Sequence, residues 1–189
     1  MTDVIVLHAA RPGHLDAAGA SALLERLPYA RRLELERRDY AARTASLRGL
    51  ELLRDGFARL RGAPLDLSHL RFPLDRKPYL EGGPWFSISH STSRVAVALS
   101  DRCELGIDVE DLGAARGGRD ALERWAATEA ALKAIGCGVR AAPDVRLSAD
   151  LATAQLADQV VYTRSVALSP DCLARIATRE PVQQVVVIE

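Results

Sequence analysis

The segment 104–110, with the sequence ELGIDVE, constrains the fold of this chain more than any other stretch. Apolar residues alternate with small or acidic ones, which is typical of a β-strand with one buried face. Gly106, Asp108 and Glu110 therefore share the face opposite the apolar residues, with the two carboxylates about 6.5–7 Å apart along the strand. Either this face is solvated and their repulsion is weak, or a divalent cation lies between them and removes it. The bare position at Gly106 slightly favours a close approach by another group.

A second segment, 125–133 with the sequence WAATEAALK, has a helical pattern. Trp125, Glu129 and Lys133 recur every four residues and form one stripe. The pair Glu129–Lys133 is either an exposed surface ion pair, contributing about 0.3–0.5 kcal/mol, or part of a groove, since alanines surround it. In the second case Glu129 is a third carboxylate for a hard cation such as Mg²⁺, which prefers oxygen ligands.

The segment 86–91, with the sequence FSISHS, combines hydroxyl groups with one imidazole. His90 has no histidine or cysteine partner at a metal-ligand spacing, and no nucleophile elbow surrounds the serines. A ring and hydroxyls at a strand end suit phosphate oxygens, and a polar turn is the alternative. Basic residues also gather at 31–44 and 76–78, where a solvated basic face is the simpler interpretation. The chain contains no Walker-type or G-x-G-x-x-G loop.

The order of elements predicts a mixed α+β protein. A strand at 4–7 precedes helices at 14–27 and 31–60, and the second helix carries leucines and a phenylalanine at spacings of three and four. Strands follow at 85–90, 94–100 and 104–110, and a helix at 119–135 ends at Gly136 and Gly138. The remainder is rich in strands, which we expect at 145–147, 160–168, 172–178 and 182–188.

Charge and cysteine content exclude several classes of protein. The 189 residues carry 25 basic and 25 acidic side chains, which argues against nucleic-acid binding through bulk charge. No apolar run approaches the roughly 18 residues of a membrane helix, and the N-terminus lacks the basic region of a secretory signal. The three cysteines are far apart and indicate neither a zinc site nor a disulfide framework, so we expect a reducing cytoplasm.

Four segments, taken in order, resemble the 4′-phosphopantetheinyl transferase superfamily of the surfactin-synthetase-activating type. That family shows Gly-Lys-Pro, then Phe-Asn-(Ile/Leu)-Ser-His-Ser, then Gly-Ile-Asp-(Ile/Val)-Glu, then Trp-x-x-Lys-Glu-(Ala/Ser)-x-x-Lys and a glycine. This chain has RKP at 76–78, FSISHS at 86–91, GIDVE at 106–110 and WAATEAALK at 125–133. The match covers about residues 31 to 138, and four motifs in order make it far more specific than any one of them.

The resemblance implies a monomer of two pseudo-twofold-related α+β halves, here 1–102 and 103–189, with coenzyme A in the cleft between them. It implies transfer of 4′-phosphopantetheine from coenzyme A to a serine of an apo acyl or peptidyl carrier protein. Adenosine 3′,5′-bisphosphate is released, and the carrier serves fatty acid, polyketide or non-ribosomal peptide synthesis. From the charge balance and the absence of a long apolar run, we expect neither a nucleic-acid nor a membrane partner.

Carried over residue by residue, the resemblance also implies a site. Asp108, Glu110 and Glu129 would hold Mg²⁺ on the pyrophosphate, in the half at 103–189. Glu129 would be the candidate base, with Lys133 and Asp108 as the other catalytic residues. The residues implied to bind coenzyme A are Arg43, Thr44, Lys77, Pro78, Ser89, His90 and Lys133.

The chain departs from the family pattern within three of these motifs. Thr128 stands where the family has a lysine, Ser87 where it has an asparagine, and Arg76 where it has a glycine. One cation on the phosphate side is therefore missing, and Arg124 or Arg140 is a candidate to replace it.

The stretch from Glu110 to Glu129 spans 19 positions, which is short for the family, and this stretch normally carries part of the carrier-docking surface. Two other functions are alternatives to the transferase. The first is a catalytically silent homologue that binds coenzyme A or a carrier protein, and the second is an unrelated Mg²⁺-dependent phosphohydrolase. Retention of the three carboxylates and Lys133 favours the transferase, because a pure binding module has no need of a metal triad.

Overall fold

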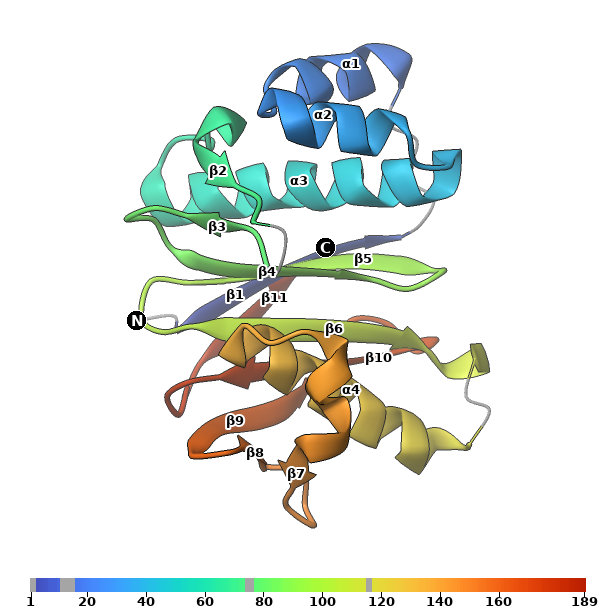
Figure 1. Ribbon diagram of the computed structural model, residues 1–189, viewed down its shortest axis with the longest axis vertical. Helices are drawn as coiled ribbons and strands as arrows, with labels where there is room; N and C mark the ends of the chain where they lie inside the picture. Colours follow the sequence, from blue (N-terminus) through green and yellow to red (C-terminus); the bar gives the residue numbers. More distant parts are fainter. Residues whose placement is uncertain (1–2, 11–15, 74–76, 115–116) are drawn as a thin grey trace.

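A computed structural model describes residues 3–10, 16–73, 77–114 and 117–189, which form a mixed α+β structure (Figure 1). Two larger sheets run in the strand orders β11-β1-β5-β4 and β6-β10-β9-β8-β7. A two-stranded sheet of β2 (Leu70–Arg71) and β3 (Tyr79–Leu80) follows the short 3-10 helix η1 (Leu67–His69). The predicted fold class, α+β, is confirmed at this level.

The first sheet is built around β1 (Val4–Ala10), which pairs antiparallel with β5 (Arg94–Ser100) and parallel with β11 (Val185–Ile188). A hairpin joins β5 to β4 (Trp85–His90), the edge strand. Three helices lie over one face of this sheet (Figure 1), and they are α1 (Ala17–Glu25), α2 (Tyr29–Glu36) and α3 (Tyr40–Arg61).

One edge of the second sheet is the strand β6 (Leu105–Asp111), which pairs antiparallel with β10 (Cys172–Thr178). The sheet continues through β9 (Gln159–Val166), β8 (Thr153–Leu156) and β7 (Arg146–Leu147). Between β6 and β7 the chain forms η2 (Leu112–Ala114), α4 (Arg119–Ile135) and η3 (Val139–Asp144).

The core is divided into three apolar clusters that define the layers. One lies between the first three helices and the first sheet, and another lies between the two sheets, with Val4, Val6, Ile107 and Ile176 fully buried. A third, made largely of alanines, packs α4 against the outer face of the second sheet. Figure 1 shows the first three helices above the first sheet and the first sheet above β6, with α4 beside β6.

Several predicted elements are confirmed at their bounds, namely the strands at 85–90, 94–100 and 172–178 and the helix at 119–135. The single helix predicted over 31–60 is wrong, because the chain breaks between α2 and α3. There Asp39 caps α3, because its carboxylate accepts the N–H of Ala42 at 2.8 Å. This side-chain hydrogen bond replaces a backbone hydrogen bond that a continuous helix would make. Strand β8 was also missed, since its four residues carry too short a pattern.

The predicted boundary between residues 102 and 103 falls in the connection from β5 to β6, which leads from the first sheet to the second. The final strand, β11, returns to the first sheet beside β1 (Figure 1). The two-half division stays a prediction. No helix within the described ranges is both long and apolar enough to span a membrane.

Candidate functional site

The site is built where α4 crosses β6 at Gly106. A Cβ atom at this position would lie 2.1 Å from the Ala130 carbonyl oxygen and 2.6 Å from the Ala134 backbone nitrogen. Real Cβ atoms do not approach backbone atoms this closely, so only glycine allows α4 to pack here. The sequence predicted that another group approaches the strand at Gly106, and that group is the helix α4. This close packing brings the neighbouring side chains of β6 and α4 together.

Asp108 is the buried centre of the site. Its side chain is only 4% exposed, which rules out the solvated strand face for this residue. The Oδ1 atom accepts hydrogen bonds from Ser89 Oγ at 3.0 Å and from Lys133 Nζ at 2.6 Å. The Oδ2 atom is buried and has no hydrogen-bond partner in the structure. A buried carboxylate oxygen without a partner is costly, so this atom marks a place for a further cation or donor.

Glu129 and Lys133 lie on α4 beside Asp108, as the stripe predicts. Lys133 Nζ is 3.5 Å from Glu129 Oε2, and both side chains are about a quarter exposed (26% and 25%). This pair is therefore not a simple surface ion pair, because the ammonium also bonds to the buried Asp108. Burial and the negative charge of Asp108 raise the pKa of Glu129 above its usual value.

Glu110 is the third carboxylate, two positions along β6 and half-buried. Its pKa is raised by burial and by the charges of Asp108 and Glu129, while a hydrogen bond from Trp125 and the charge of Lys133 oppose the shift. We call Asp108, Glu110 and Glu129 the acid cluster. The charge of Asp108 hinders the ionisation of Glu110 and of Glu129, so a cation bound among the three carboxylates would relieve the repulsion.

The serines of β4 attach the edge of the first sheet to the edge of the second. Ser87 Oγ accepts the N–H of Ile107 at 3.2 Å, and Ser89 Oγ accepts the N–H of Val109 at 3.3 Å. The Ser89 hydroxyl also accepts from Lys133 Nζ at 3.1 Å and donates to Asp108. Its one donor and two acceptor positions are all used. Ser89 therefore orients Asp108 and Lys133 together, a role that the sequence did not indicate.

Asp111, at the end of β6, holds the turn between β4 and β5, and no sequence pattern had singled it out. Its carboxylate accepts from Ser91 Oγ at 2.7 Å, from the N–H of Thr92 at 2.8 Å, and from the hydroxyl of Ser93. These bonds lower the pKa of Asp111, although burial opposes them. The polar-turn interpretation is thus correct for this part of the FSISHS segment and the residues after it. His90, at the end of β4, is exposed.

A cleft of about 770 Å³ opens beside the acid cluster, and we call it the cationic cleft. Its lining includes Glu129, Lys133 and Lys77, together with residues 136–141. A second hollow of about 480 Å³ shares Lys77 with it and is lined by Pro78 and Trp85, among others. The two hollows adjoin at Lys77, Gly136 and Cys137, which line both of them. Arg76 lies outside the described residues.

Lys77 is held where the two hollows adjoin. Its Nζ donates to the Leu105 carbonyl at 2.5 Å. Burial lowers the pKa of Lys77 to about 8, while the charge of Glu104 opposes the shift and that of Arg179 adds to it. A desolvated ammonium of this kind gains stability from an anion, so the cleft favours a negatively charged ligand.

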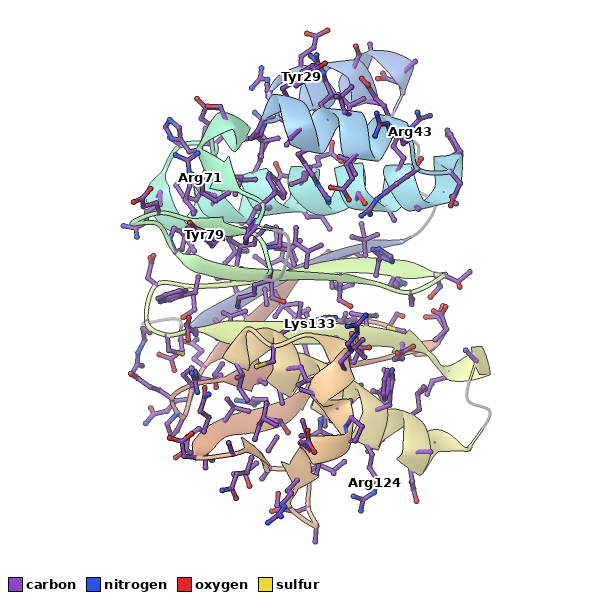
Figure 2. The ribbon with its side chains drawn as sticks, in the orientation of Figure 1. Tyr29, Arg43, Arg71, Tyr79, Arg124 and Lys133 are labelled. Atoms are coloured by element: carbon purple, nitrogen blue, oxygen red, sulfur yellow. The ribbon has the colours of Figure 1, made fainter. Side chains whose placement is uncertain are left out.

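Arg43 and Thr44 are not brought to the acid cluster. Both lie near the start of α3, and the Thr44 hydroxyl donates to the Tyr40 carbonyl of the preceding turn at 2.8 Å. Figure 2 shows Arg43 on the helical side of the first sheet and Lys133 on the opposite side. Their predicted contact with coenzyme A stays a prediction.

The residues present suit a hard cation, because all three candidate ligands are carboxylates and Asp108 Oδ2 has no partner. The described residues nevertheless contain no ready-made group of three or more histidine, cysteine or acidic side chains in metal-binding positions. The Lys133 ammonium neutralises Asp108 directly and lies within ion-pair distance of Glu129. The acid cluster is thus one electrostatic site without a closed ligand shell. A bound Mg²⁺ would have to be held by Asp108, Glu110 and Glu129.

The three cysteines, Cys103, Cys137 and Cys172, are free, and Cys137 is the exposed member, beside both hollows. Taken together, the site pairs a buried acidic centre with a cleft lined by cations. Comparison of the chain with protein-family models finds no matching family, and comparison with curated protein sequences finds no matching protein.

Proposed function

We propose that this protein is a 4′-phosphopantetheinyl transferase that moves the phosphopantetheine group of coenzyme A to a serine of an apo acyl or peptidyl carrier protein. The observation that carries the proposal is the acid cluster with its unpartnered Asp108 oxygen, opening beside a cleft that holds Lys77 and Lys133. The four ordered motifs supply the reaction class, and the side chains from them that lie in or beside this region are Lys77, Ser89, Asp108, Glu110, Glu129 and Lys133.

In the proposed reaction the carrier serine oxygen forms a bond to the phosphorus that bears pantetheine. The bond from that phosphorus to the bridging pyrophosphate oxygen breaks, and adenosine 3′,5′-bisphosphate leaves with the electron pair. Glu129, which lines the cationic cleft, takes the serine proton. Lys133 and Lys77 balance phosphate charge, and the acid cluster would hold Mg²⁺. When bound, Mg²⁺ neutralises the charge that builds on the phosphate oxygens.

The direct test is intact-mass spectrometry of several apo carrier proteins incubated with this protein, coenzyme A and Mg²⁺. We expect one carrier class to gain a single phosphopantetheinyl group, and the gain to disappear when EDTA replaces Mg²⁺. Coenzyme A binding without modification of any carrier would instead identify the silent homologue. Release of free phosphopantetheine in the absence of a carrier would identify the phosphohydrolase.

The affinity for coenzyme A should fall as the pH rises from 7 to 9. Lys77, with a pKa of about 8, is mostly charged at the lower pH and mostly neutral at the higher, which predicts a loss of up to about tenfold. Titration calorimetry at pH 7, 8 and 9 measures this. Lys77→Met should bind more weakly at pH 7 and lose most of the pH dependence. The charges facing Lys77, Glu104 and Arg179, remain in both proteins, so an equal pH dependence in the variant would contradict the assignment.

A further inference from the structure

The cationic cleft is lined by positive charges from three separate segments of the chain. Lys77 comes from the loop before β3, Lys133 from α4, and Arg140 from η3, while Glu129 is the acidic side chain among the lining residues. The first two belong to the motifs of the sequence, but Arg140 belongs to none. Its position therefore calls for an explanation of its own.

The structure distinguishes between the candidates for the missing cation. Thr128, which stands where a lysine was expected, is buried, and its hydroxyl donates to the Arg124 carbonyl at 2.9 Å. It faces its own helix and contributes nothing to the cleft. Arg124 lies at the edge of the molecule, well away from Lys133, as Figure 2 shows, and it does not line the cationic cleft. Of these residues only Arg140 lines the cleft.

The end of α4 explains how Arg140 reaches this place. Gly136 adopts a left-handed conformation with φ of 84°, and its N–H and that of Cys137 both donate to the Leu132 carbonyl, at 2.8 and 2.9 Å. The chain then turns and begins η3 after Gly138, whose carbonyl accepts the N–H of Ala141 at 3.1 Å. This tight connection returns the chain to the cleft that Lys133 lines.

We propose that Arg140 is a phosphate-binding residue, which completes with Lys77 and Lys133 a subsite for a diphosphate group in the cationic cleft. The identification of that group as the pyrophosphate of coenzyme A rests on the proposed function. A guanidinium suits this role because its fork of donors binds two phosphate oxygens at once. Arg140 is exposed, so its pair with a phosphate would form at the surface, where neither charge has to be fully removed from water.

Titration calorimetry with inorganic pyrophosphate and with coenzyme A, each with Mg²⁺, tests the subsite. Arg140→Ala should weaken both ligands about tenfold, which corresponds to about 1.4 kcal/mol. Arg140→Lys should keep part of the affinity, because it retains the charge and loses the fork. Arg124→Ala is the matched control, because it removes an exposed arginine that does not line the cationic cleft. This variant should bind both ligands like the unaltered protein.

Cys137 localises the effect, since it is exposed in the cleft whereas Cys103 and Cys172 are buried. Pyrophosphate should slow alkylation of Cys137, as followed by peptide mass spectrometry, and the same concentration should protect the Arg140→Ala protein less. Arg140 is on the surface, so circular dichroism should show an unchanged fold.

The subsite is overturned if the unaltered protein binds neither ligand, if Arg140→Ala binds both normally, or if Arg124→Ala weakens binding as much. Pyrophosphate binding that depends on Arg140, with no binding of coenzyme A, would keep the subsite and reject the proposed function. Normal carrier modification and normal affinities in Arg140→Ala would reject the subsite and keep the proposed function.

Discussion

Asp108→Asn should reduce phosphopantetheine transfer by about a thousandfold or more while the protein stays folded. The substitution keeps the shape of the side chain. The hydrogen bonds that Ser89 and Lys133 make to Asp108 can rearrange around the amide. It removes the charge at the centre of the acid cluster. Loss of a metal ligand removes several kcal/mol of transition-state stabilisation, and each 1.4 kcal/mol or so is a factor of ten in rate.

Single-turnover mass spectrometry of a carrier protein, over a series of Mg²⁺ concentrations, measures this effect. The variant should need more Mg²⁺ as well as react more slowly, which distinguishes a ligand from a residue that only packs. Asp158→Asn, an exposed carboxylate in the turn between β8 and β9, is the control and should react normally. Near-normal turnover of Asp108→Asn at ordinary Mg²⁺ would show that the metal assignment is wrong.

Gly106→Ala should have the largest effect on stability, lowering the free energy of unfolding by about 3 kcal/mol. The added Cβ would meet the Ala130 carbonyl oxygen at 2.1 Å and the Ala134 nitrogen at 2.6 Å. These are backbone atoms of α4, so the whole helix must move rather than one side chain. For a chain of this size, the midpoint of thermal unfolding should fall by about 6–12 °C.

Calorimetric or circular-dichroism melting of Gly106→Ala against Gly113→Ala checks this prediction. A Cβ at Gly113 would have no atom within 4 Å, and its φ lies outside the left-handed region, so that variant should melt near the unaltered protein. Movement of α4 also displaces Glu129 and Lys133 from Asp108, so Gly106→Ala should lose activity below its melting point. Equal melting temperatures for the two variants would show that α4 can shift at little cost.

Local pattern accounts for much of what the sequence predicted correctly. Alternation placed Ile107 and its apolar neighbours between the sheets and turned Asp108 towards α4. Helical periodicity placed Glu129 and Lys133 on one stripe, and it identified both ends of α4. These features depend on residues close in sequence, where backbone geometry alone decides which side chains share a face. Where a single side chain competes with the backbone, as Asp39 does, the same reasoning merged two helices into one.

The sequence by itself thus determined the strands and helices around the site, their faces and the three carboxylates that make up the acid cluster. Only the tertiary structure decided which groups meet there, because such contacts join residues far apart in the chain. In the folded chain Lys133 bonds to Asp108, and Ser89 links the two sheets. Asp111 bonds to the turn between β4 and β5, and Arg140 rather than Arg124 lines the cationic cleft. The pattern of residues along the chain shows whether a segment is a helix or a strand, but it does not show how two segments pack. Here the close approach of α4 to Gly106 sets that packing.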